Sequence, residues 1–318
     1  MQNMKSIELK PSYPLLFAII IISMLIVASL SLFNKKSDVL ITLQVGTLSF
    51  ETRNSLNNLF ALGRTVEKNA VYIQQFSSFG VYDSSVRGEP LVVNETSTDI
   101  ADRLTLKDVS INELNIPAGA FIKLSALDSE VEQVSIQFQN IESSFHFHPI
   151  NNDASYKFNY FSENKIPEGG QIMVKPSDKK FNMSFRFEAE SGLMESEIIQ
   201  IDHLNINQMI NDTLQPSIKS GVIHVVNIGE KLIIHKNSRL YFQPSDIFYI
   251  TDLFIKNGTI NVVLEGNTTS IEYGSNRTNI IPNYLYFFAK NNFVLIIFNT
   301  IFVLITFMLT MVKFTNEK

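Results

Sequence analysis

The chain has 318 residues and a net charge of −5, and it contains no cysteine. The lack of cysteine excludes disulfides, thiolate metal sites and cysteine nucleophiles. The mildly acidic charge, without any block of lysine or arginine, argues against nucleic-acid binding, which needs a basic surface.

The first predicted element is a transmembrane helix at residues 14–33, after a short tail at residues 1–13. Leu15 to Phe33 is a run of 19 residues without a charge. At about 1.5 Å per residue, such a run matches a hydrocarbon core of about 30 Å. We interpret it as an uncleaved anchor because it is longer than the apolar part of a signal peptide, and a cleaved signal peptide is the alternative.

The long middle of the chain is predicted to be a soluble, mainly β domain. Apolar and polar residues alternate at residues 134–138, 156–160 and 181–189, which is the pattern of strands with one buried face. The run at residues 247–255 is more continuously apolar. Antiparallel strands of this kind favour a sandwich or jelly-roll-like fold.

Turn signals separate these strands. Asn257-Gly258 lies between two strand-like runs and predicts a tight hairpin. Gly169-Gly170 and residues 265–267 predict further turns. Helical patterns are few, and we expect short helices only around residues 206–210 and within residues 55–70.

A boundary inside the middle region is predicted near Leu214–Gly221, where Pro216 and Gly221 interrupt the pattern. It would separate a β-rich front part at residues 34–215 from a cluster of hairpins at residues 216–282 that could be a second subdomain. A long loop within one domain would give the same pattern.

The last predicted element, at residues 283–312, is an interfacial aromatic segment followed by a second transmembrane helix, and a short tail at 313–318 ends the chain. Phe293 to Val312 is a run of 20 residues without a charge. The aromatic residues of Tyr284–Phe288 suit the boundary between lipid and water.

The second hydrophobic run carries polar residues at helical spacing. Asn299, Val303, Thr306 and Thr310 fall along one face of a helix. Polar groups in lipid favour a neighbouring helix, so we predict a contact seam here. Its partner would be the first helix, a second copy in a homo-oligomer, or another membrane protein; alternatively, the threonines bond only to their own backbone.

If both segments span the membrane, both tails lie on the same side of it. The lysines next to the two segments give only a small bias, and they favour cytoplasmic tails with the middle domain outside. A large domain without disulfides fits a bacterial envelope or a cytoplasmic location. We therefore expect a two-pass protein of the bacterial inner membrane with a periplasmic domain.

Few residues suggest chemistry. His146 and His148 would share one face of a strand and are the candidate metal ligands, but they need a third ligand from elsewhere. The acidic pairs in residues 188–197 fit a solvated strand face better than a catalytic or calcium site. Nucleotide-binding, hydrolase and metalloprotease motifs do not occur. We therefore expect no catalytic site, no metal and no cofactor.

These observations favour a non-enzymatic membrane protein whose β domain binds or scaffolds a partner in the cell envelope. Its partners would be the lipid bilayer and a protein, with a glycan or a lipid-linked molecule as the second choice. One alternative is a cytoplasmic, ligand-sensing β domain coupled to a membrane-acting effector. The other is a membrane-anchored hydrolase of the envelope.

Overall fold

The computed structural model describes residues 32–57, 70–82, 92–95, 102–113, 115–128, 133–159, 161–186, 198–210, 213–256 and 258–293, with scattered positions from 21 to 30 and from 296 to 305. The chain divides into two compact units. The β-unit is Asp38–Ile280, and the terminal unit combines Met1–Ser37 with Ile281–Lys318.

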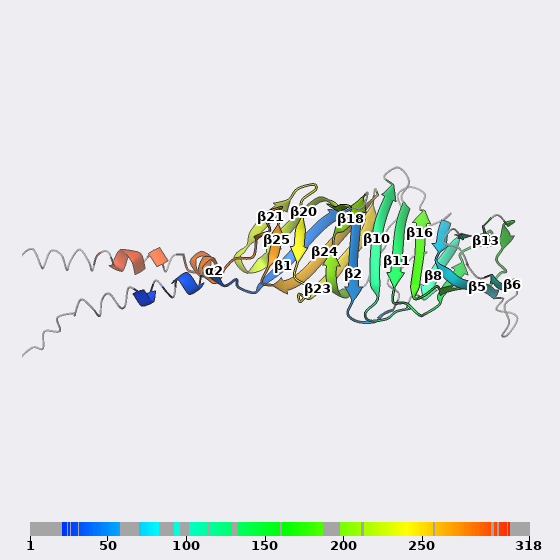
Figure 1. Cartoon of the computed structure of the whole chain (residues 1–318), viewed down its shortest axis with the longest axis horizontal. Coiled ribbons are helices and arrows are strands. Elements are labelled where there is room, and N and C mark those ends of the chain that lie inside the picture. Colours follow the sequence, from blue (N-terminus) through cyan, green and yellow to red (C-terminus); the bar gives the residue numbers. More distant parts are fainter. Residues whose placement is uncertain are drawn as a thin grey trace, which may run out of the picture. The chain divides into compact units, whose positions relative to one another are not determined.

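The β-unit is built from antiparallel strands, as the sequence predicts. Several of its long strands lie side by side in Figure 1, and the main sheet has 14 strands among the described residues. In spatial order they are β14 (Asn164–Lys165), β13 (Ser155–Phe158), β7 (Leu104–Lys107), β4 (Ala70–Gln74), β16 (Lys180–Arg186), β11 (Gln133–Gln139), β10 (Phe121–Asp128), β2 (Thr47–Thr52), β17 (Ile199–Asn205), β23 (Phe248–Lys256), β24 (Thr259–Thr268), β1 (Ser37–Val45), β20 (Ile218–Val225) and β21 (Glu230–Ile234).

Among the described residues, four smaller sheets accompany the main sheet. The largest of them has five strands, in the order β6 (Val92–Glu95), β5 (Phe76–Tyr82), β15 (Gln171–Pro176), β12 (Phe145–Pro149) and β8 (Val109–Glu113). The others are β18 (Asn207–Ile210) with β19 (Thr213–Pro216), then β22 (Leu240–Phe242), β25 (Ile271–Tyr273) and β26 (Thr278–Asn279), and finally β3 (Leu56–Asn57) with β9 (Asn115–Ile116). A short 3-10 helix, η1 (Val226–Ile228), joins β20 to β21.

Aromatic side chains join the five-stranded sheet to the main sheet. Phe145 of β12 stacks on Phe181 of β16 with ring centroids 3.9 Å apart and an interplanar angle of 9°. Phe76 of β5 meets Phe158 of β13 edge to face at 6.0 Å. All four side chains are buried. The two sheets therefore pack as a β-sandwich-like core, which confirms the predicted fold class at this level.

The alternation in the sequence accounts for which residues enter this core. Ile136 and Phe138 of β11 are buried and pair with Met183 and Phe181 of β16, which are buried as well. Ser184 on β16 lies on the opposite face and is partly exposed. Each large apolar side chain buried in this way contributes about 1.5–3 kcal/mol to folding, which fixes the register of the strands.

Two of the three predicted turns are confirmed, and one is wrong. Lys256 pairs with Thr259, so β23 and β24 form the expected two-residue hairpin. The N–H of Gly170 donates to the carbonyl oxygen of Pro167 at 2.8 Å, which closes the second turn. Residues 265–267, however, lie inside β24, where Gly266 pairs with Phe248. A Cβ on Gly266 would meet the Phe248 ring at 2.4 Å, so glycine is needed for close packing rather than for a turn.

The helix expected around residues 206–210 is also wrong. Asn207–Ile210 is strand β18 and pairs with β19, because pairing with a neighbouring strand overrides a weak helical spacing. Of the other expected helix, Leu56–Asn57 is strand β3 and Ala70 begins β4, while residues 58–69 lie outside the described residues.

Strands from both sides of the predicted boundary at Leu214–Gly221 share the main sheet. β20 begins within the boundary segment and runs past it, and it pairs with β1 from Val39↔Val225 to Val45↔Ile218. Residues 38–280 also form one compact unit. The division at residue 216 into a front part and a hairpin cluster stays a prediction.

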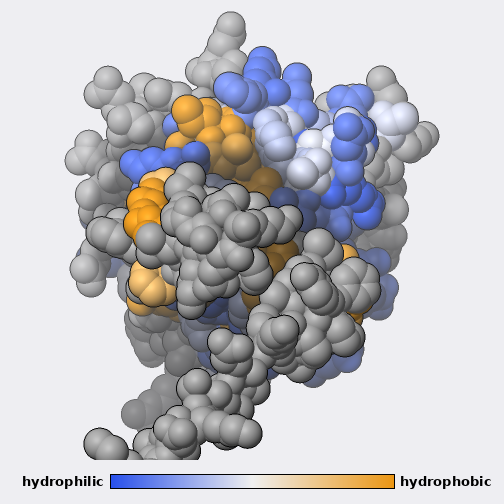
Figure 2. Space-filling model, turned by 90° about the vertical axis from the view of Figure 1, so that its left-hand side faces the viewer, coloured by the Kyte–Doolittle hydropathy of each residue, from blue (hydrophilic) through white to orange (hydrophobic). Residues whose placement is uncertain are grey.

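The predicted transmembrane segments lie only partly within the described residues. The described positions from 21 to 30 and from 296 to 305 are helical. Within the part of the chain that the structure describes, no helix is both long enough and apolar enough to span a membrane. Several of these helical positions carry exposed apolar side chains, including Leu25, Phe302 and Val303. Figure 2 shows hydrophobic surface, in orange, beside hydrophilic surface, in blue.

The packing of Gly266 gives a direct test of the sheet. Gly266→Ala should lower the free energy of unfolding by about 1–3 kcal/mol, because the new Cβ collides with the Phe248 ring. Gly46→Ala is the matched control, since its Cβ would meet only ordinary contacts at 3.5 Å or more. Urea unfolding followed by circular dichroism measures both. Equal effects of the two substitutions would contradict the close approach.

Candidate functional site

The two candidate metal ligands lie on β12 and point away from the core. Phe145 and Phe147 of this strand are buried, whereas His146 and His148 alternate with them and are partly exposed. Nδ1 of His146 lies 3.5 Å from Oε1 of Gln171. Among the described residues, no group of three or more histidine, aspartate or glutamate side chains is placed to hold a metal ion. The two histidines therefore share a strand face, and the described structure brings no third ligand to it.

The other residues considered for chemistry are dispersed. Nε2 of His203 lies 3.9 Å from a carboxylate oxygen of Glu51, His224 is on β20, and His235 follows β21. The acidic pairs within residues 188–197 lie outside the described residues. The histidines on these described strands are therefore not gathered into one site.

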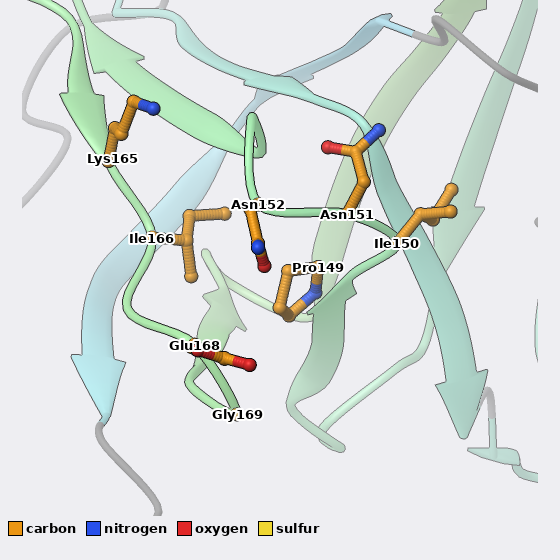
Figure 3. Close-up of a pocket in the computed structure, with 8 residues that line it drawn as sticks. All are labelled: Pro149, Ile150, Asn151, Asn152, Lys165, Ile166, Glu168 and Gly169. Atoms are coloured by element: carbon orange, nitrogen blue, oxygen red, sulfur yellow. The ribbon is translucent and has the colours of Figure 1, made fainter.

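A pocket of about 360 Å³ opens where two turns of the β-unit meet. One side comes from the segment after β12, and the other from β14 and the turn that follows it. Figure 3 draws its lining residues, which are Pro149, Ile150, Asn151, Asn152, Lys165, Ile166, Glu168 and Gly169. In this view Asn152 projects between Ile166 and Pro149, while Lys165 and Ile150 lie at the outside.

One backbone hydrogen bond links the two sides of this pocket, and a second hydrogen bond lies within the turn on one side. The N–H of Ile166 donates to the carbonyl oxygen of Ala154 at 2.9 Å, and Asn151 Oδ1 accepts from the N–H of Asp153 at 2.9 Å. Lys165 Nζ lies 3.4 Å from Asp153, so its charge is partly balanced. Glu168 adds an exposed carboxylate. The pocket can thus accept and donate hydrogen bonds around an apolar floor formed by Ile166, which suits binding.

The pocket is less suited to catalysis than to binding. Its eight described lining residues include one carboxylate and one lysine but no histidine, serine, threonine or tyrosine. The pocket was not predicted from the sequence, because its lining residues are of types that are typical of ordinary turns. The linear pattern does not reveal that the turn near residue 151 meets the turn near residue 168.

A polar network fixes the strand that carries Lys165. Ser155 Oγ donates to Glu163 at 2.5 Å, and Lys107 Nζ lies 2.9 Å from the same carboxylate. The Ser155 hydroxyl, and then the Lys107 ammonium, lower the pKa of Glu163 below its ordinary value of 4.5. Glu163 thereby connects β7 and β13 to the turn that leads into β14.

In the terminal unit, the chain segments that lead into the two hydrophobic runs are paired. The N–H of Tyr284 donates to the carbonyl oxygen of Phe33 at 2.9 Å, and the N–H of Lys35 donates to that of Pro282 at 3.0 Å. Asn34 and Asn283 face each other between these bonds as an antiparallel bridge. We call residues 33–35 and 282–284 the junction.

The helix α2 (Tyr284–Asn291) begins directly at the junction. The Asn283 side chain caps it by accepting the N–H of Tyr286 at 2.7 Å. The Lys35 ammonium lies 3.0 Å from the centre of the Phe287 ring, a cation–π contact across the junction. The predicted interfacial aromatic segment is therefore helical, and it is attached to the other end of the chain.

The predicted contact seam is described only in part. Asn299 and Val303 are helical and exposed, whereas Thr306 and Thr310 lie outside the described residues. Thr300, next to the seam, donates its hydroxyl to the carbonyl oxygen of Ile296 in its own helix at 2.8 Å. The seam stays a prediction.

No protein-family model matches the chain, and no curated protein matches it in sequence.

The Glu163 network predicts a dependence of stability on pH. A lowered folded-state pKa means that ionised Glu163 stabilises the fold above pH 4.5, and that this stabilisation is lost as the pH falls through the lower folded value. Wild type should therefore exceed Glu163→Gln in free energy of unfolding by up to about 1 kcal/mol at neutral pH, since the group is half exposed.

This difference should vanish in acid, as measured by urea unfolding across the pH range. Ser155→Ala removes the first cause of the shift and should reduce the difference at neutral pH. A difference that stays constant down to the lowest pH would rule out the proposed role of the ionised carboxylate.

Proposed function

We propose that this chain is a two-pass membrane protein whose β-unit binds or scaffolds a partner outside the cytoplasm. In this proposal residues 14–33 and 293–312 span the bacterial inner membrane, and an antiparallel sandwich or jelly-roll-like domain lies between them in the periplasm. Both tails are cytoplasmic. The partner is a protein first and a glycan or lipid-linked molecule second, and no catalysis is involved.

The observation that supports this proposal is the junction. Two membrane spans that flank one domain can enter the same bilayer surface as a pair if the chain segments next to them are paired. The backbone hydrogen bonds from Tyr284 to Phe33 and from Lys35 to Pro282 join the last residue of the first hydrophobic run to the start of α2, which precedes the second run. The runs themselves have the length and apolarity of transmembrane helices in the sequence.

The pocket of the β-unit supports binding as the role of the domain. Its amide groups, its carboxylate at Glu168 and its apolar residues can bind a turn of a partner protein or the hydroxyl groups of a sugar. Asn151, Asn152 and Ile150 are exposed, so a large partner can reach them. In this proposal the membrane anchors hold the domain near its partner, and the domain binds that partner through the pocket.

Cysteine accessibility tests the topology. The chain has no native cysteine, so single substitutions can be labelled without background. Lys236 is exposed in the β-unit, and Lys236→Cys should react with a membrane-impermeant maleimide in intact bacterial cells. Glu317→Cys, in the C-terminal tail, should react only after the inner membrane is opened. Val134→Cys is the control for a buried position and should stay unlabelled in the folded chain.

The other outcomes are equally informative. Protection of Lys236→Cys until lysis would place the β-unit in the cytoplasm and overturn the proposed orientation. Labelling of both Lys236→Cys and Glu317→Cys in intact cells would contradict two membrane spans. Binding of a partner is then tested with Glu168→Gln and Asn152→Ala, which should weaken capture of that partner without changing the labelling pattern.

A further inference from the structure

Aromatic and basic residues lie around α2 and the junction in one region of the terminal unit. We call it the collar and define it by Lys35, Lys36, Tyr284, Tyr286, Phe288 and Lys290. Its centre is α2, which is capped by Asn283 and held to the N-terminal segment by the contact of Lys35 with Phe287. The collar therefore has a defined geometry, although it is built on a short helix.

The collar exposes an unusual amount of aromatic surface. None of the eight residues of α2 is buried. Tyr284, Tyr286 and Phe288 have 43%, 45% and 48% of their surface exposed. A helix of this length is only marginally stable in water on its own. Three exposed rings on it indicate that another medium covers them.

The charge of the collar has one sign. Residues 33–37 and 281–293 contain Lys35, Lys36 and Lys290 and no aspartate or glutamate. Lys36 is exposed, and the Lys35 ammonium lies over the Phe287 ring, which holds this charge close to the helix. A surface with aromatic rings and only positive charge is complementary to an anionic, partly apolar layer.

The position of the collar in the chain identifies that layer. The apolar run that starts at Phe293 follows α2 directly, and the first apolar run ends at Phe33, two residues before Lys35. Tyrosine rings suit the headgroup level of a bilayer, and lysines next to a membrane surface bind anionic lipid. An acidic protein would match the charge, but it would not explain why the collar adjoins both apolar runs.

We propose that the collar binds the headgroups of anionic phospholipids, with Lys35 and Lys36 contacting lipid phosphate and the rings of α2 lying in the headgroup layer. This inference rests on the proposed two-pass function and names a partner of the same region. It gives the junction a second role, because the bound lipids hold this part of the terminal unit at the membrane surface.

Tryptophan fluorescence tests the inference on the full chain, which has no native tryptophan. Phe288→Trp places a reporter in the collar. The chain is reconstituted in mixed phosphatidylcholine and phosphatidylglycerol vesicles in which only one of the two lipids carries bromine, a quencher of tryptophan. We expect bromine on phosphatidylglycerol to quench more strongly than bromine on phosphatidylcholine at the same lipid fraction.

Charge removal provides the matched comparison. Lys35→Gln with Lys36→Gln should reduce the enrichment of phosphatidylglycerol by about fivefold for each lysine, and high salt should reduce it in the unsubstituted reporter chain. Lys231→Gln with Lys236→Gln removes two exposed lysines of the β-unit and should leave the enrichment unchanged. An equal loss in both double variants would overturn the proposal.

Two further outcomes separate this inference from the proposed function. Equal quenching by both lipids would place the collar in the membrane without headgroup selectivity, which overturns the inference and leaves the two-pass function intact. Absence of quenching in a chain that resists extraction by alkaline carbonate would also overturn only the inference. Absence of quenching in a chain that carbonate extracts would overturn both.

Discussion

Two backbone hydrogen bonds at the junction, from Tyr284 to Phe33 and from Lys35 to Pro282, are the constraint on which the functional account depends. They join residues about 250 positions apart in the sequence. The cost in chain entropy of closing so long a loop grows only slowly with its length, and the folded β-unit provides the stability that keeps it closed. As a consequence, Phe33 at the end of the first hydrophobic run is joined to the start of α2, which carries Lys290 and precedes the second run.

Alternation of apolar and polar residues made much of the β-unit predictable. It located the strands around residues 134–138 and 181–186, and Asn257-Gly258 located the hairpin of β23 and β24, because these signals depend on neighbours in the sequence. The order of the main sheet depends on distant segments, such as β2 next to β17 and β1 next to β20, and local patterns do not contain it. Gly266 was misread for the same reason, since the Phe248 ring that excludes a side chain there belongs to another strand.

In the candidate sites, too, features that depend on neighbouring residues could be predicted, and features that depend on distant segments could not. The strand period correctly put His146 and His148 on one face, but only the fold could tell whether a third ligand joins them. The pocket was not predicted because its lining consists of turn residues, which are common on any protein surface. The collar could be predicted only in part. The aromatic run at 284–288 indicated a segment at the boundary between lipid and water, whereas its pairing with Lys35 depends on a contact between residues far apart in the sequence.

The most direct test of the junction is a disulfide between its two facing residues in native membranes. Asn34 and Asn283 form a non-hydrogen-bonded antiparallel pair, in which Cα atoms lie about 4.5 Å apart, within the range that a disulfide bridges. We expect Asn34→Cys with Asn283→Cys to cross-link under mild oxidation in chains that stay in the membrane after alkaline carbonate. Cysteines that each react with maleimide but do not join, or cross-linked chains that carbonate releases, would contradict the account.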